Sequence, residues 1–328
     1  MNVGDSAMSA NSLGDYGDSM QATARCGGHV TLLFSIHSES EDPLQQGSRG
    51  AGFCVEAGVE CTIQAIPLSE GEEFSVNIGI QTTDGPIDDE TVALLYVDVI
   101  EEFMQRKLLD ENLCYHIDVT LELPLSQGFG MSAAGALSCA KALCSLLELE
   151  TEPTQIAHII ERKNSSGLGD VLAATVGGIE LRTQPGAPLS SGRATSFSSE
   201  VEVLLCWDPD FKRHTRTYID DPQWKVAISE AGEESVSRLS VGDWNSSRWQ
   251  QLLDEAERFG ESAGLVDELG RSTLIERVKK QIPSSHRVLP CMLGTSVCIL
   301  PENLSTPLAN LEEVLLASSI ECLRTRIN

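Results

Sequence analysis

Residues 124–135 have the sequence PLSQGFGMSAAG, which is the stretch most informative about the fold. Apolar and polar residues alternate over 115–123 just before it, which predicts a half-exposed strand. Small residues follow it, and the spacing predicts a helix over 132–149. Gly128 and Gly130 permit positive φ in the turn, so that backbone N–H groups can crowd an anion at the positive end of the helix.

Three interpretations of this turn compete. It is not a Walker A loop, because no GK[ST] follows the glycines. GFGMSA matches the dinucleotide pattern GxGxxA, but the acidic residues about 20 positions on, Glu148 and Glu150, are not preceded by a second strand. The third interpretation is a tight turn without a ligand. Within the turn, Ser132 can cap the helix or bind a phosphate-bound metal ion.

Strands and helices mix along the chain without strict alternation, which favours an α+β class over a doubly wound sheet. The segment 36–50 is predicted as a polar loop, and 183–192, rich in Pro, Gly and Ser, as a linker. The patterns predict strands at 22–35, 51–66, 73–82, 201–207, 287–292, 295–300 and 321–327, and helices at 88–109, 153–163, 222–239, 244–263, 265–281 and 307–317.

Charge limits the partners of this 328-residue chain. It carries 23 Lys and Arg against 49 Asp and Glu, a net charge of −26, and only seven of the basic residues are Lys. Nucleic acids and anionic membrane surfaces attract clustered cations, so neither is expected as a partner. Excess carboxylate with little Lys suits solubility at very high salt and predicts a salt-loving host. An acidic protein of a mesophile remains the alternative.

No stretch approaches the roughly 20 apolar residues of a membrane helix, and residues 1–21, polar and acidic, are expected to form a disordered tail. The ten cysteines form no CxxC pair, and most lie in apolar stretches. They are expected to be reduced core residues of a cytoplasmic protein.

Four motifs carry a resemblance to a known family. The first, around 124–135, resembles the ATP-binding loop of GHMP kinases, with Phe129 and Met131 replacing Leu and Ser of the usual pattern. Further motifs resemble those of archaeal pantoate kinases, and the order of all of them matches. They are GHVT (28–31) with EDPL (41–44) and GSRGAG (47–52), SGLGDV (166–171) with Gly177-Gly178, and CMLGTSV (291–297).

The resemblance implies a GHMP kinase fold. Residues 22–190 are then an ATP-binding domain like domain 2 of ribosomal protein S5, and residues 191–328 are a ferredoxin-like domain. The implied cofactors are ATP and Mg²⁺, and the implied substrate is pantoate, phosphorylated on the way to coenzyme A in archaea. A homodimer is common in the family.

The resemblance also implies a role for individual residues. Asp170 is the expected catalytic residue, which orients or deprotonates the acceptor hydroxyl. Ser132 and Glu161 are the expected metal ligands. The expected ATP-binding residues are Pro124, Gly128, Phe129, Gly130, Met131, Ser132, Ala133 and Ala134, and the expected substrate-binding residues are Ser48, His158, Arg182 and Thr215. Arg49 and the cluster Lys212-Arg213 are weaker candidates for the substrate site, and no chemistry is assigned to His29 or His37.

Two rival functions remain open. The first is a GHMP kinase that acts on another small acceptor, such as homoserine, shikimate or mevalonate. The second is a non-catalytic GHMP-fold binding protein, against which the presence of Asp170, Glu161 and Ser132 argues.

Overall fold

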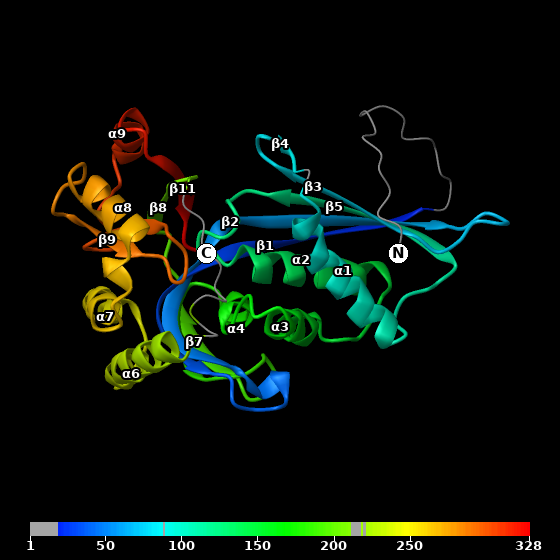
Figure 1. Ribbon diagram of the computed structural model, residues 1–328, viewed down its shortest axis with the longest axis horizontal. Helices are drawn as coiled ribbons and strands as arrows, with labels where there is room; N and C mark the ends of the chain where they lie inside the picture. Colours follow the sequence, from blue (N-terminus) through cyan, green and yellow to red (C-terminus); the bar gives the residue numbers. More distant parts are fainter. Residues whose placement is uncertain (1–18, 88, 211–217, 219–220) are drawn as a thin grey trace.

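A large sheet forms one end of the molecule (Figure 1). The computed structural model describes residues 19–328 except 88, 211–217 and 219–220. The strand order is β4-β3-β5-β2-β6-β7, with β1 paired to β2. The strands are β1 (Met20–His37), β2 (Gly47–Pro67), β3 (Val76–Thr82), β4 (Gly85–Pro86), β5 (Leu113–Leu121), β6 (Ile179–Gln184) and β7 (Arg193–Phe197).

The ribbon formed by β1 and β2 curves around helices α2, α3 and α4 (Figure 1). The register of β1 on β2 shifts twice, between Gly27 and His29 and between Thr31 and Leu33. Such irregularities bend a strand and re-aim its side chains. The helices at this sheet are α1 (Glu90–Gln105), α2 (Met131–Leu146), α3 (Pro153–Lys163) and α4 (Asp170–Val176).

Helix α2 is the central helix of this half because its side chains are small. Ala133, Ala134 and Ala136 are buried, and a Cβ atom at Gly135 would lie only 2.7 Å from the Tyr96 hydroxyl of α1. Backbone can therefore approach closely on several sides of α2, which packs against β1, β2, α1 and α3.

A smaller antiparallel sheet lies at the other end, in the order β11-β8-β10-β9. Its strands are β8 (Glu202–Trp207), β9 (His286–Pro290), β10 (Val297–Pro301) and β11 (Glu321–Arg326). The helices that follow β8 are α6 (Pro222–Leu239), which packs against β1 and β2 of the large sheet, and α7 (Trp249–Ser262), α8 (Leu269–Lys279) and α9 (Leu311–Ala317). The short 3-10 turns are η1 (Pro43–Gln45), between β1 and β2, and η2 (Ser246–Arg248) and η3 (Leu265–Asp267), on either side of α7.

The two sheets meet at the bend of β1 and β2. The loop between β9 and β10 reaches β1, where the Met292 N–H donates to the Thr31 carbonyl at 3.1 Å. On the other side, Ile327 bridges Val55 of β2. The cavity described below opens at this junction.

Three sequence expectations are wrong. The predicted tail extends too far, since Met20 and Gln21 already pair with β2; residues 1–18 lie outside the described part of the chain. The predicted loop 36–50 ends too late, because Gly47–Gly50 belong to β2. The predicted linker 183–192 is the connection of a hairpin, since β7 folds back onto β6. The glycine and proline residues of segments 36–50 and 183–192 favour loops and linkers. Pairing in the sheet outweighs this local propensity.

The cysteines behave as expected. All ten are free, and eight of them are buried. Within the described residues, no helix has both the length and the apolar character needed to cross a membrane.

Candidate active site

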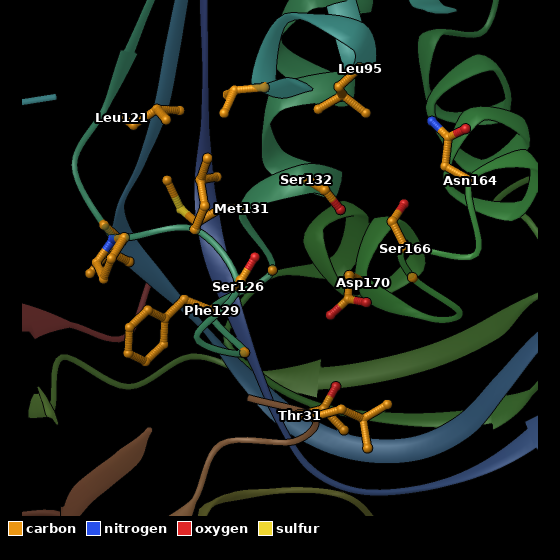
Figure 2. A pocket seen from close by; sticks show the side chains of 18 of the residues that line it. Thr31, Leu95, Leu121, Ser126, Phe129, Met131, Ser132, Asn164, Ser166 and Asp170 are labelled. Atoms are coloured by element: carbon orange, nitrogen blue, oxygen red, sulfur yellow. The ribbon is translucent and has the colours of Figure 1, made fainter. Parts of the chain in front are cut away.

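A cavity of about 1070 Å³ lies between the large sheet, the start of α2 and the loop between β9 and β10. Leu95 and Leu121 lie towards one end of the cavity, and Thr31 and Asp170 lie towards the other (Figure 2). Ser48 lies near Asp170, since a Cβ atom at the neighbouring Gly169 would contact its hydroxyl. Figure 2 shows Ser126, Ser132 and Ser166 between these ends. The cavity therefore joins an apolar compartment to a polar one through a row of hydroxyl groups.

The glycine-rich turn forms one wall. Gly128 and Gly130 have φ of 84° and 65°, the left-handed region that glycine adopts at little cost. Gly130 is the N-cap of α2, and no side chain caps that helix end. The backbone N–H groups of the first turn are thus available to an anion, and the helix dipole favours negative charge there.

Phe129 faces away from the polar end of the cavity. Its ring is buried and packs edge-on against Trp207 of β8, with 6.0 Å between centroids. Its carbonyl accepts a hydrogen bond of 3.0 Å from the His29 N–H. Phe129, which replaces the leucine of the GHMP kinase loop pattern, therefore anchors the turn to both sheets.

Ser132 does not cap the helix. It is the second residue of α2, and its hydroxyl donates to Glu161 Oε1 of α3 at 2.5 Å. Ser166 donates to the same oxygen at 2.6 Å. Burial of Glu161, together with the negative charge of Asp170, raises the pKa of its carboxyl to about 7. Oxygen atoms of this kind, next to an anion site, are ligands that Mg²⁺ prefers.

Asp170 begins α4, with Gly169 as the N-cap, and its side chain retains 21% exposure in the cavity. Its Oδ1 lies 2.7 Å from His29 Nδ1. Burial raises the pKa of Asp170, but the hydrogen bond from His29 and the positive charges of His29 and Arg182 outweigh burial and leave the pKa below its ordinary value. Asp170 is therefore a carboxylate at neutral pH that faces the cavity.

Arg182 lies behind this carboxylate, on β6. Its side chain is fully buried and donates to Glu180 Oε1 at 2.9 Å. Its Nε has no hydrogen-bond partner among the described residues. A Cβ atom at Gly169 would lie 2.8 Å from that Nε and 2.2 Å from the Ser48 hydroxyl, so glycine is what allows these groups to meet under the turn.

Four expected substrate residues thus have different positions. Ser48 lines the cavity, and Arg182 lies directly behind it. His158 does not line it: its Nε2 lies 3.1 and 3.0 Å from the carbonyl oxygens of Pro43 and Gln46, and burial lowers its pKa to about 4. His158 therefore holds the turn that leads into Ser48. Thr215, like the cluster Lys212-Arg213, lies outside the described residues.

The remaining residues of the predicted ATP site fall in two groups. Pro124 and Met131 line the cavity with the glycines. Ala133 and Ala134 are buried in α2 and contribute backbone. His37, without an assigned chemistry, and Arg49, a weaker candidate, both contact Glu233 of α6, away from the cavity.

Sequence reasoning missed His29. An isolated histidine beside two glycines in an apolar strand is a weak signal of a buried polar role. Its partners, Asp170 and Glu180, lie 141 and 151 residues further along the chain, so no local pattern connects them.

The chain is similar to known kinases in sequence and in fold. Residues 95–178 match the family model of the GHMP kinase N-terminal domain. The chain is 28% identical over 265 residues to a pantoate kinase of Methanocaldococcus jannaschii, across 80% of this chain and 87% of that one. It is 29% identical over 312 residues to a pantoate kinase of Methanospirillum hungatei, across 90% and 92%.

A solved structure described as a phosphotransferase related to the CoA biosynthesis pathway has a TM-score of 0.74 and 23% identity, and the match covers 94% of this chain and 96% of that one. The expected α+β class is confirmed. The chain has the GHMP kinase fold, with the GHMP kinase N-terminal domain at residues 95–178.

Proposed function

We propose that the protein transfers the terminal phosphoryl group of ATP to a hydroxyl group of pantoate, which yields 4-phosphopantoate and ADP for coenzyme A synthesis. The observation that carries this proposal is the position of Asp170. Its carboxylate faces the cavity that the uncapped start of α2 also lines. Relatives named pantoate kinase that align over most of the chain support the choice of substrate.

ATP fits the cavity in one direction. The apolar end near Leu95 and Leu121 suits a purine base. The turn 128–134 then presents backbone N–H groups to the phosphates, where charge must be neutralised during transfer. Ser132 and Glu161 are the groups that would hold Mg²⁺, which neutralises phosphate charge when bound. The terminal phosphate is thereby directed towards Asp170.

Pantoate fits the polar end. Ser48 can donate a hydrogen bond to it, and the buried guanidinium of Arg182 supplies positive charge for its carboxylate. In a chain of net charge −26, an anionic substrate needs such a local cation. Asp170 then accepts the proton of the attacking hydroxyl. Thr215 remains a proposed substrate residue.

A division into two domains, a cytoplasmic location and a homodimer are parts of the same proposal. They follow the resemblance to pantoate kinases rather than the site. The expected boundary at residues 190 and 191 lies too early, because β7 still pairs with β6 in the large sheet.

The decisive experiment measures ADP release by the purified protein with Mg²⁺ and ATP over a panel of hydroxy acids and alcohols. We expect turnover of pantoate at least about 100-fold above that of homoserine, shikimate or mevalonate. All four carry a carboxylate, but a pocket that matches the hydroxyl groups of pantoate leaves buried polar groups unpaired with an acceptor of another shape. Turnover of one of these instead of pantoate would identify a different GHMP kinase. ATP binding without turnover of any acceptor would indicate a binding protein.

The acidic composition leads to a prediction on salt. We propose a halophilic archaeal source, and we expect the melting temperature to rise by roughly 5 °C or more between 0.1 and 2 M KCl, because screening weakens the repulsion among carboxylates. The measurement is a thermal melt followed by circular dichroism. Sucrose at the same osmolality controls for general exclusion of solute from the surface. Equal melting temperatures across the KCl series would contradict the prediction.

A further inference from the structure

His29 joins the two halves of the site. Through its backbone N–H it bonds the Phe129 carbonyl of the phosphate-side turn. Through its side chain it contacts two carboxylates, with Nδ1 2.7 Å from Asp170 Oδ1 and Nε2 3.0 Å from Glu180 Oε1. The proposed phosphate site and the proposed base therefore rest on the same residue.

His29 is buried, and neighbouring glycines leave space for it. His29 is 1% exposed, between the two register shifts of β1. A Cβ atom at Gly52 on β2 would lie only 3.0 Å from His29 Nε2, and one at Gly130 would lie 2.9 Å from its backbone N. Gly52 thus makes room for the imidazole ring, and Gly130 makes room for the backbone of the same residue.

Three charged groups face the ring. Asp170 of α4 and Glu180 of β6 contact its two nitrogens, and Arg182 of β6 lies 3.3 Å from Nε2 and also donates to Glu180. Glu180 and Arg182 have no side-chain exposure. Both ring nitrogens can donate to carboxylates only when the ring is protonated, and the two carboxylates favour that form.

We propose that His29 is a positioning residue for phosphoryl transfer. It fixes one carboxylate oxygen of Asp170 from behind and leaves the other for the acceptor hydroxyl, while Glu180 and Arg182 fix the ring. This inference rests on the proposed function, because it assigns a task to the orientation of Asp170. A carboxylate that is free to rotate would lose the alignment on which its rate advantage depends.

The test compares His29→Gln with His29→Asn. The amide nitrogen of Asn can replace Nδ1 and keep the bond to Asp170, whereas the longer Gln places its amide nearer to Glu180. We expect His29→Gln to lower kcat about 100-fold, with the KM for ATP changed less than about threefold. His29→Asn is expected to recover at least tenfold of that loss. His286→Gln changes another buried histidine, in β9 and away from the cavity, and is expected to leave kcat unchanged.

Crystal structures of the wild type and of His29→Gln provide a readout that needs no acceptor. The carboxylate of Asp170 is expected to change its rotamer in the variant. An unchanged rotamer, or equal losses of kcat in both His29 variants, would overturn the inference. A wild type that turns over no acceptor would refute the proposed function alone, since the rotamer comparison would still decide whether His29 positions Asp170.

Discussion

Asp170→Asn is expected to lower kcat by about 1,000-fold while the protein stays folded. A positioned general base contributes about 10²–10⁴-fold to a rate, and an amide cannot accept the proton of the acceptor hydroxyl. The KM for ATP is expected to change little, because the turn 128–134 and the start of α2 remain intact. Steady-state kinetics with pantoate measure both quantities.

The fold should tolerate this substitution for a local reason. Asn has the shape of Asp, so its amide oxygen can still accept the 2.7 Å hydrogen bond from His29. The substitution also removes a negative charge that raises the pKa of Glu161. The melting temperature is therefore expected to stay within a few degrees of the wild-type value.

Asp118→Asn is the matched control, because Asp118 is an exposed residue of β5 and does not line the cavity. It makes the same change of charge without touching the site and should leave kcat as it is. Turnover by Asp170→Asn close to the wild-type rate would remove Asp170 from its proposed role.

The sequence was sufficient to predict the features that depend on residues close together in the chain. The turn at 128–130 and the helix after it follow from glycines and small residues within a dozen positions. The boundaries of α3 at Pro153 and Lys163 were also predicted, because proline marks a first turn and apolar spacing marks the helix.

The sequence was insufficient to predict contacts between residues far apart in the chain. Gly47–Gly50 have low strand propensity, yet they pair with β1, and Gly50 pairs with Arg182 of β6. The position of His158 could not be predicted either, since its partners are carbonyl oxygens 112 and 115 residues away. The first contacts depend on how the strands pair, and the contact of His158 depends on how α3 packs against η1; residues close in sequence determine neither.

Glu161→Gln is expected to stabilise the metal-free protein above pH 7 and to abolish most of its Mg²⁺-dependent activity. The pKa of Glu161 in the folded protein is about 7, against an ordinary value of 4.5. A carboxyl whose pKa is raised by folding contributes fully to stability below pH 4.5, and this contribution is lost as the pH rises through 7. Ionised Glu161 therefore opposes folding at pH 8, by about 3 kcal/mol at most.

Glutamine removes this cost and keeps the local hydrogen bonds. Its Oε1 can still accept from Ser132 and Ser166, and its amide carries no charge to repel Asp170. It cannot, however, supply the anionic oxygen that Mg²⁺ prefers. The same carboxylate thus weakens the metal-free fold and serves the proposed metal site, as is common for functional groups.

The measurement is the free energy of unfolding by urea, in EDTA, at pH 5 and pH 8. The difference between Glu161→Gln and the wild type is expected to be near zero at pH 5 and to reach up to about 3 kcal/mol at pH 8. Glu102→Gln is a control, for which the opposite change in the free energy of unfolding at pH 8 is expected. Glu102 is also buried on a helix, but Lys163 and Arg106 outweigh its burial and lower its pKa. Removing its charge should therefore destabilise the protein at pH 8.

Binding of Mg²⁺ and ATP distinguishes the proposed role of Glu161 in metal binding from its effect on the stability of the metal-free protein. Mg²⁺ and ATP together are expected to raise the melting temperature of the wild type more than that of Glu161→Gln, because binding to the folded state alone adds stability. A Glu161→Gln protein that is less stable than the wild type at pH 8 would show that the ionised carboxylate is well accommodated without metal. A variant that gains as much from Mg²⁺ and ATP as the wild type would place the metal on other groups.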